Sequence, residues 1–265
     1  MSYLLFGVLP YFAAALFLGG LAARVSEWRR TPVPLWLALP PVPPSKSAAA
    51  RRLVVDALLF RPLRKRDFLL WLGAVLFHYS LLLALLGHLR FFVYPVPIWI
   101  SLLQYPAAAA SLVLPASLFL LFFRRLVINR LISTWTDYLP LGLILASVLT
   151  GLALKYLARE NLVEVKAMTL GLVLIRPYLP RDLSWLFYLH FLLALTLMAY
   201  CPFSKLIHGL GLFFSPLNHQ ADDPGRRRHV NPWDAEEPAD WPLSRTMEEE
   251  PGRTIRAGTR ASNQG

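Results

Sequence analysis

Five long apolar segments alternate with short charged connections in this chain, and they limit the folds open to it. A helix needs about twenty apolar residues to cross the hydrocarbon of a bilayer, and each segment approaches or exceeds that length. Hydrophobic residues make up 56% of the 265 residues and charged residues only 16%, which is too apolar for a soluble domain. We therefore predict an all-α membrane bundle of five transmembrane helices. The predicted spans cover residues 3–23, 68–89, 98–123 and 138–156, and the fifth lies in the apolar stretch 183–212.

Lysine and arginine predict the orientation of the bundle, because cytoplasmic connections of membrane proteins are enriched in both. With the loop after the first span inside, 21 of the 27 basic residues fall on the cytoplasmic side. We therefore expect the N-terminus outside and the C-terminus in the cytoplasm. No positive charge precedes the first span, so we expect it to be retained rather than cleaved as a secretory signal. The same distribution accounts for the net charge of +11 without nucleic acid as a partner.

Segments outside the spans have predictions of their own. Residues 47–63 are equally compatible with a short surface helix and with a solvated loop. The apolar run 168–175 has only eight residues, so we predict an interfacial helix at the outer face rather than a sixth span. From residue 215 the chain is polar and rich in proline. The predicted domains are a transmembrane domain, 1–214, and a cytoplasmic tail, 215–265, which is disordered or bound to a partner.

Four histidines lie in two of the apolar segments, and the other predicted spans hold none. His78 and His88 are ten residues apart in the second span, and His190 and His208 are eighteen apart in the fifth segment. A polar imidazole in hydrocarbon is disfavoured unless something binds it. Neutral imidazole is a good ligand for iron, and facing helices of a bundle commonly hold such sites. We predict that the four histidines ligate two haem irons.

Depth in the membrane predicts how the ligands pair, because the two spans are antiparallel. His88 and His190 lie toward the outside and form the outer pair, whereas His78 and His208 lie toward the cytoplasm and form the inner pair. Ten residues of helix rise about 15 Å and eighteen about 27 Å, so the two spacings do not match along straight helices. Pro202, six residues before His208, is expected to bend or end the helix there.

The haem type follows from cysteine usage. The chain has one cysteine, Cys201, and no C-x-x-C-H motif, which excludes a covalently attached c-type haem and leaves two haem b groups. Cys201 itself is expected to be a small packing residue. Arg90 at the outer end of the second span and Lys205 beside the inner pair are candidate partners for haem propionates, since both side chains pair with carboxylates.

Two other classes of function compete with electron transfer. A haem-free transporter or proton relay would use the histidines directly, but it predicts acidic residues in the same spans, and 68–89 and 183–212 contain no Asp or Glu. A scaffold that anchors soluble subunits, with haem incidental, is the second alternative. The presence of two reducible b-type haems separates the electron carrier from a colourless protein.

LFHYSLLLALLGH at 76–88 and YLHFLLALTLMAYCPFSKLIHGLG at 188–211 resemble the di-haem cytochrome b family of respiratory nitrate reductase gamma subunits. The resemblance extends over residues 3–214. It implies that His78, His88, His190 and His208 are the haem ligands. It also implies an electron-transfer subunit of a quinone-linked oxidoreductase, which passes electrons between the menaquinone pool and a cytoplasmic iron–sulfur subunit and is not itself catalytic for the terminal substrate.

The tail sequence FFSPLNHQADDPGRRRHVNPWD is more similar to the DsrM branch of this family, the membrane cytochrome of the sulfite-reductase-associated DsrMKJOP complex. That branch implies a role in sulfur metabolism, a DsrK-like cytoplasmic partner, further DsrJ-, DsrO- and DsrP-like subunits, and the bacterial cytoplasmic (inner) membrane with its lipid as surroundings. The alternative is a quinol-oxidising nitrate reductase gamma subunit. That branch has a lysine at its quinol site near the start of the third span, whereas this chain has no lysine between Lys65 and Lys155.

Overall fold

The computed structural model describes residues 3–30, 45–128 and 133–214, and the structure of these residues is helical with no strand. The described residues end at 214, so the predicted tail, 215–265, lies outside them. The predicted domain boundary between residues 214 and 215 therefore stays a prediction. Five helical stretches are long and apolar enough to cross a membrane, which confirms the predicted five-helix bundle. They are Leu4–Arg30, Phe68–Phe91, Ile98–Val127, Trp135–Ala158 and Trp185–Phe203.

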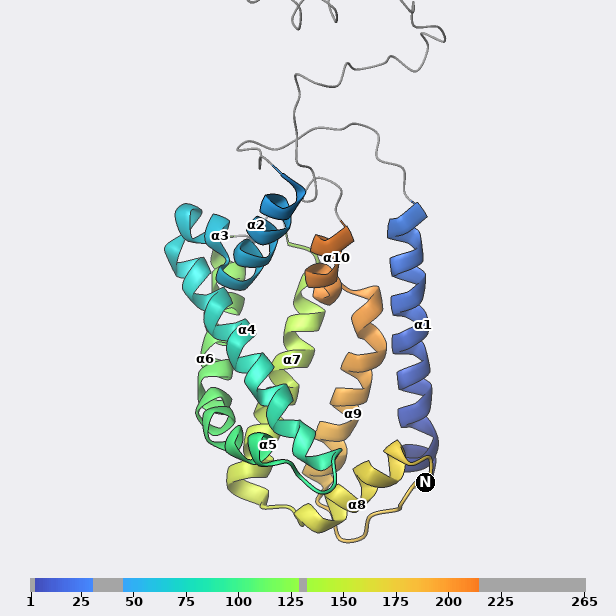
Figure 1. Ribbon diagram of the computed structural model, residues 1–265. Helices are drawn as coiled ribbons and strands as arrows, with labels where there is room; N and C mark the ends of the chain where they lie inside the picture. Colours follow the sequence, from blue (N-terminus) through green and yellow to red (C-terminus); the bar gives the residue numbers. More distant parts are fainter. Residues whose placement is uncertain (1–2, 31–44, 129–132, 215–265) are drawn as a thin grey trace, which may run out of the picture. The chain divides into compact units, whose positions relative to one another are not determined.

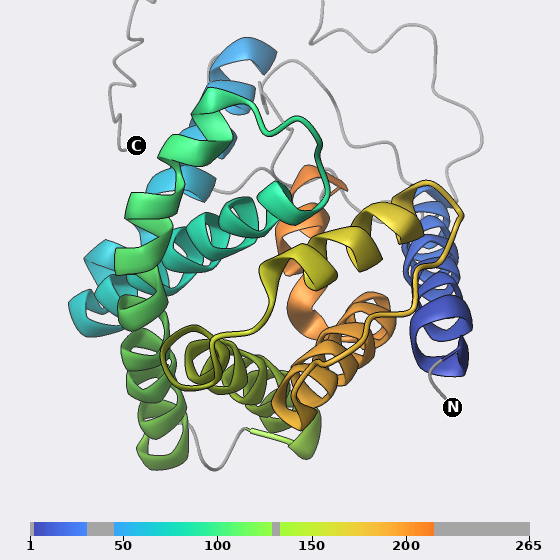
Figure 2. The same cartoon turned by 90° about the horizontal axis from the view of Figure 1, so that it is seen from below.

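The long helices pack side by side in a fixed order (Figures 1 and 2). The closely packed neighbours are α4 with α6, α6 with α7, α7 with α9, and α9 with α1, so α4 and α1 end the series. α4 is antiparallel to α9, whereas α1 runs parallel to it. The bounds are α1 Leu9–Arg30, α4 Phe68–His88, α6 Gln104–Val127, α7 Trp135–Ala153 and α9 Trp185–Tyr200.

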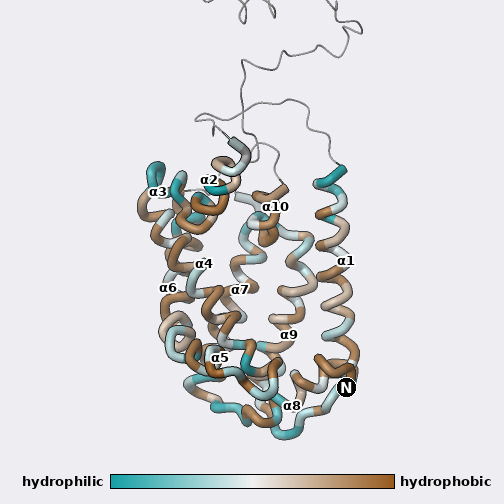
Figure 3. Tube along the Cα trace, in the orientation of Figure 1, coloured by the Kyte–Doolittle hydropathy of each residue, from teal (hydrophilic) through white to brown (hydrophobic). Residues whose placement is uncertain are grey.

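Hydropathy divides the bundle along its length (Figure 3). The middle of the long helices is apolar, whereas α3, Arg61–Arg66, and the C-terminal end of α1 are hydrophilic. Many large apolar side chains of the long helices stay exposed, including Leu82, Leu85 and Leu112. A soluble protein rarely leaves so much apolar surface uncovered, so these faces are suited to lipid.

One end of the bundle carries the short helices α2, Lys46–Leu59, α3, and α10, His208–Phe214, and is called the α10 end (Figure 1). α2 decides between the two predictions for residues 47–63 in favour of a helix. Ser45 caps its N-terminus through a bond from the Ala48 amide at 3.2 Å. Side chains of α4 bind its C-terminal carbonyls, with Tyr79 donating to Leu58 and Trp71 to Leu59, both at 2.9 Å.

The opposite end carries α5, Ile98–Leu102, and α8, Leu162–Val173, and is called the α8 end (Figure 1). α8 includes part of the apolar run 168–175, and its 12 residues are too few to span a bilayer, as predicted. A buried cluster of Phe6, Val165, Met168 and Phe187 attaches it to the start of the first span, just before α1, and to α9. The Tyr11 hydroxyl also donates to the Leu172 carbonyl at 2.9 Å.

Proline acts differently at three of its sites in the spans. Pro106 lies in the first turn of α6, just after the break at Leu103 that separates α5 from α6, while Pro115 lies inside α6. In the fifth span α9 ends at Tyr200, and Pro202 lies in a 3₁₀ turn that follows it. The helix therefore does not continue unbroken to His208, because proline cannot donate the next helical hydrogen bond. Figure 1 shows α10 displaced from the axis of α9 toward α2.

The second span begins with a charged cap. The Asp67 carboxylate accepts from the Leu70 amide at 2.8 Å and pairs with Arg124 of α6. The hydrogen bond from the Leu70 amide, together with Arg124, lowers the pKa of Asp67 below its usual value, so the carboxylate remains charged at neutral pH. This cap fixes the start of the helix that carries His78 and His88.

Candidate functional site

The outer pair lies at the α8 end of the bundle, where α4 ends and α9 begins. The ring centroids of His88 and His190 are 6.4 Å apart, and the rings are nearly parallel, inclined by 20°. α4 and α9 are not closely packed neighbours, so the two rings face one another across a gap between the helices. The structure thus places His88 beside His190, the two residues that were predicted to pair from their depth in the membrane.

The inner pair lies at the α10 end. The ring centroids of His78 and His208 are 5.9 Å apart, and their planes are almost perpendicular, at 80°. Two phenyl rings surround His78, with Phe60 and Phe77 each at 4.9 Å from its centroid. Phe60 occupies the left-handed conformation, φ 50°, between α2 and α3, so the surface helices contribute directly to the inner pair.

The separations of both pairs fit one metal ion between two imidazoles. A metal–imidazole bond is about 2 Å long and the ring centre lies roughly 1 Å behind the bonding nitrogen, so two axial rings have centroids about 6 Å apart. The observed values of 6.4 and 5.9 Å agree with this geometry.

The hydrogen bonds of the four rings select the tautomer that can bind a metal. Nδ1 of His78 lies 2.7 Å from the Ala74 carbonyl, and Nδ1 of His88 lies 2.7 Å from the Ala84 carbonyl. Nδ1 of His208 lies 2.8 Å from the Lys205 carbonyl, and Nδ1 of His190 lies 3.0 Å from that of Ser147. A carbonyl only accepts, so Nδ1 carries the hydrogen in each ring. The lone pair of a neutral ring is then on Nε2, the nitrogen that a metal would take.

His190 differs from the other three, because its acceptors come from the neighbouring helix α7. Besides the Ser147 carbonyl, the Thr150 hydroxyl lies 3.0 Å from Nδ1. A Cβ on Gly151 would stand 3.1 Å from the Cε1 atom of His190, closer than an ordinary contact, so a side chain there would require the ring to shift. None of these three α7 residues was among the predicted site residues. Ser147, Thr150 and Gly151 lie at positions i, i+3 and i+4 of an otherwise aliphatic span, and this spacing of small and polar residues on one helix face could have indicated them.

Arg90 lies beside a small pocket at the α8 end. Its guanidinium donates to the Gln104 side chain at 2.7 Å and stands 4.7 Å over the Phe91 ring, which in turn lies 6.1 Å from the His88 ring. The pocket has a volume of about 180 Å³. It is lined by Arg90, Phe91, Val96, Ser101, Gln104, Leu162 and Lys166.

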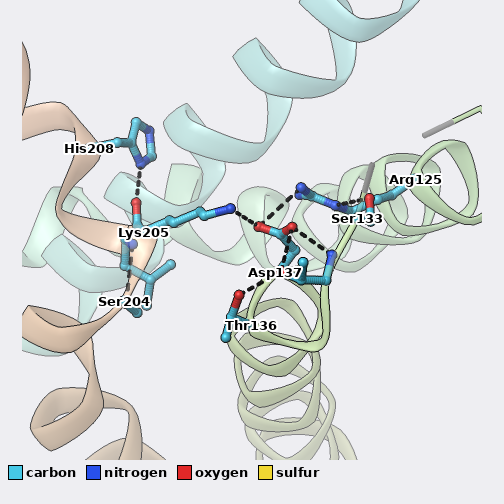
Figure 4. A network of polar contacts seen from close by, with 9 residues as sticks. Arg125, Ser133, Thr136, Asp137, Ser204, Lys205 and His208 are labelled. Atoms are coloured by element: carbon cyan, nitrogen blue, oxygen red, sulfur yellow. Dashed lines mark hydrogen bonds and ion pairs between the residues drawn. The ribbon is translucent and has the colours of Figure 1, made fainter. Parts of the chain in front are cut away.

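Lys205 lies beside the inner pair, and its side chain extends toward α7 (Figure 4). Nζ donates to Oδ1 of Asp137 at 2.5 Å, and Arg125 of α6 approaches the same oxygen at 3.2 Å. The Asp137 side chain is only 2% exposed. Asp137 was not among the predicted site residues. It is 68 residues from Lys205 in the chain, and its sequence position indicates only a helix-capping residue.

Comparison with known proteins identifies the family of the chain. The family described as nitrate reductase gamma subunit matches residues 63–228, a range that includes all four histidines. A protein of Archaeoglobus fulgidus, the Hdr-like menaquinol oxidoreductase cytochrome b-like subunit, is 35% identical over 92% of this chain and 86% of its own length. The protein of the same description from Archaeoglobus profundus is 34% identical over 87% of this chain and 82% of its own length.

Proposed function

Because this chain belongs to the nitrate reductase gamma subunit family, we propose that it is a membrane di-haem cytochrome b that transfers electrons for a quinone-linked oxidoreductase. The observation that supports this most directly is the presence of two histidine pairs at different depths, each with the ring separation of axial ligands. The relatives are described as subunits of menaquinol oxidoreductases, which supports menaquinol as the electron donor.

His88 and His190 would hold the outer haem b, and His78 and His208 the inner one. Bound haem b supplies a one-electron carrier at each depth. Two imidazoles per iron leave no open coordination position, which favours electron transfer over oxygen or substrate binding. The four Nδ1–H bonds hold the rings in place and increase the electron density at Nε2. The histidines therefore orient two carriers in series across the apolar part of the bundle.

Arg90 and Lys205 are the proposed partners of the haem propionates. Each already makes a hydrogen bond, Arg90 to Gln104 and Lys205 to Asp137. A guanidinium has five N–H donors and an ammonium three, so these bonds leave donors for a propionate. Arg90 lies at the α8 end and would serve the outer haem, whereas Lys205 lies at the α10 end and would serve the inner haem.

The pocket beside Arg90 is the proposed binding site for the quinol headgroup. Arg90, Gln104, Ser101 and Lys166 supply polar groups around a volume of about 180 Å³. The Phe91 ring lies between this pocket and His88, with 6.1 Å between the two ring centroids, so a headgroup there would be close to the outer pair. Polar residues at the α8 end would take over the role that the family resemblance assigns to a lysine absent from this chain.

Electrons would then leave from the inner pair to a cytoplasmic iron–sulfur subunit. The cytoplasmic assignment of the α10 end rests on its basic residues, including Arg61, Arg64 and Arg66 of α3. The resemblance of the tail to the DsrM branch supports a DsrK-like partner and a role in sulfur metabolism. A nitrate reductase partner is the alternative within the same family. The N-terminus would lie outside and the C-terminus inside.

Optical spectroscopy of the purified full-length protein tests the proposal. We expect two b-type haems per chain, both reduced when a short-chain naphthoquinol is added. A colourless protein would contradict the electron-carrier function and favour the haem-free relay. Haem that is present but never reduced by quinol or by dithionite would favour the scaffold. Co-purification followed by identification of the bound subunits separates the sulfur-metabolism partner from a nitrate reductase partner.

A further inference from the structure

A buried carboxylate at the start of α7 connects three parts of the chain near the inner pair (Figure 4). Oδ1 of Asp137 contacts Lys205 at 2.5 Å and Arg125 at 3.2 Å. Oδ2 accepts from the Thr134 amide at 3.1 Å. One negative charge therefore faces two positive ones. The cluster of Asp137, Lys205 and Arg125, called the charge cluster below, has a net charge of +1.

Helix capping explains only half of these contacts. The bond from Thr134 to Oδ2 completes a capping box, which a surface carboxylate at this position would also make. Oδ1 makes no contribution to that motif, because both of its partners come from other helical elements. Burying a charge to 2% exposure is unfavourable unless it is paired and hydrogen-bonded. The two cations satisfy this condition, and the ion pair holds the Nζ end of Lys205 beside α7.

Lys205 in turn holds His208 through its main chain. The Lys205 carbonyl accepts from Nδ1 of His208 at 2.8 Å. Helix α9 has already ended, and Ser204 is extended, with φ −116° and ψ 174°. A rigid helix from α9 therefore does not position His208. Local anchors do so instead, among them the Ser204 hydroxyl, which accepts from the Leu206 amide at 3.2 Å, and the ion pair of Lys205.

We propose that Asp137 is a positioning residue for the inner haem, because it holds Lys205, whose carbonyl holds the ligand His208. The charge cluster also raises the reduction potential of this haem. The inference rests on the proposed di-haem function. Asp137 lies outside the set of ligands and acts on haem only through its neighbours. A net positive charge beside a redox centre favours the reduced form. The cluster would thus favour electron arrival at the inner haem, the last carrier before the partner.

Redox titration of the full-length protein, with the two haems distinguished by electron paramagnetic resonance, tests this inference. Asp137→Asn leaves two cations uncompensated and is expected to raise the potential of the inner haem. Lys205→Met removes one cation and is expected to lower it, with Lys205→Arg restoring the wild-type value. The outer haem should keep its signal and its potential in all variants, which also reports that the protein is folded. Glu27→Gln is the matched control, because Glu27 is an exposed carboxylate of α1 paired with Arg24.

Opposite shifts of the inner haem in the first two variants would support the inference. An unchanged inner potential, or equal shifts of both haems, would overturn it. If Asp137→Asn does not fold, Arg125→Gln takes its place, because Arg125 pairs with the same carboxylate and is not a proposed propionate partner. Its loss is expected to lower the potential of the inner haem. A wild-type protein with fewer than two haems would instead refute the proposed function, so the two failures are distinguishable.

Discussion

The His88 and His190 rings lie 6.4 Å apart and almost parallel, although they belong to helices that do not pack closely against one another. The His78 and His208 rings are almost perpendicular, at 80°. The relative orientation of axial imidazole planes affects the electronic structure of a low-spin ferric haem. We therefore predict two different low-spin signals in electron paramagnetic resonance, the more anisotropic one from the inner haem. Loss of that signal in His208→Ala, with the other retained, would verify the assignment, and two identical signals would contradict it.

Thr150 on α7 is expected to lower the reduction potential of the outer haem. Its hydroxyl lies 3.0 Å from Nδ1 of His190, and Thr150→Val removes it at nearly constant volume. Nε2 then binds iron less strongly, which destabilises the ferric form, so the potential of the outer haem should rise while that of the inner haem stays constant. The effect on stability should be about 1 kcal/mol, because the Ser147 carbonyl still accepts.

Thr196→Val is the control for this change, since the Thr196 hydroxyl bonds only to the Leu192 carbonyl of its own helix among the contacts of the described residues. Redox titration of both variants gives the comparison. An outer potential that moves equally in the two variants would show that Thr150 has no specific role.

Gly151 leaves room for the His190 ring, and a larger residue there should displace it. A Cβ would lie 3.1 Å from Cε1, closer than ordinary van der Waals contact, so Gly151→Ala should weaken the outer site and Gly151→Leu should abolish it. We expect the leucine variant to keep about one haem per chain. Gly142→Ala on the same helix meets no atom within 4 Å and should retain both haems. Full pigment content in Gly151→Leu would be inconsistent with the observed packing.

The five spans could be predicted from the sequence, because apolar length is a local property of the chain. The order of the spans also predicted which histidines lie near one another, and their role as haem ligands stays a prediction. The sequence predicted less about the fifth span. The spacing from His190 to His208 is compatible with a continuous helix, whereas the structure ends α9 at Tyr200 and turns the chain before His208. Pro202 indicated a break, but the direction of the turn depends on contacts with other helices.

The supporting residues could not be predicted for a similar reason. Asp137 reads locally as a capping residue, and only the folded chain brings Lys205 and Arg125 to it. Thr150 and Gly151 read as ordinary small residues of a membrane helix. Their roles depend on how α7 is rotated against α9, which hydrophobic periodicity does not fix when every face of a helix is apolar.

Gln104 tests the proposed quinol pocket without changing a histidine. Gln104→Leu removes the acceptor of the Arg90 guanidinium and one polar group of the pocket lining. A hydrogen bond to a charged group contributes about 1.5 kcal/mol of free energy, and its loss would raise the barrier to quinol oxidation by a similar amount. We therefore expect haem reduction by a naphthoquinol to slow about tenfold. Reduction by dithionite should not change, because it bypasses the pocket. Stopped-flow absorbance measures both rates.

Tyr105→Phe serves as the control, because Tyr105 is the next residue and is 79% exposed. It should react with naphthoquinol at the wild-type rate. If Gln104→Leu also reacted at that rate, the quinol would bind elsewhere, and the proposed role of this pocket would be wrong.

The haem content of the purified protein and of its His190→Ala variant tests the central claim most directly. Two pairs of neutral imidazoles should bind two b haems in the wild type, and removal of one outer ligand should leave about one, with the signal of the inner haem unchanged. Leu189→Ala, a substitution at the neighbouring and more exposed position of the same helix, should retain two. Two haems in the His190→Ala variant, or none in the wild type, would contradict the account.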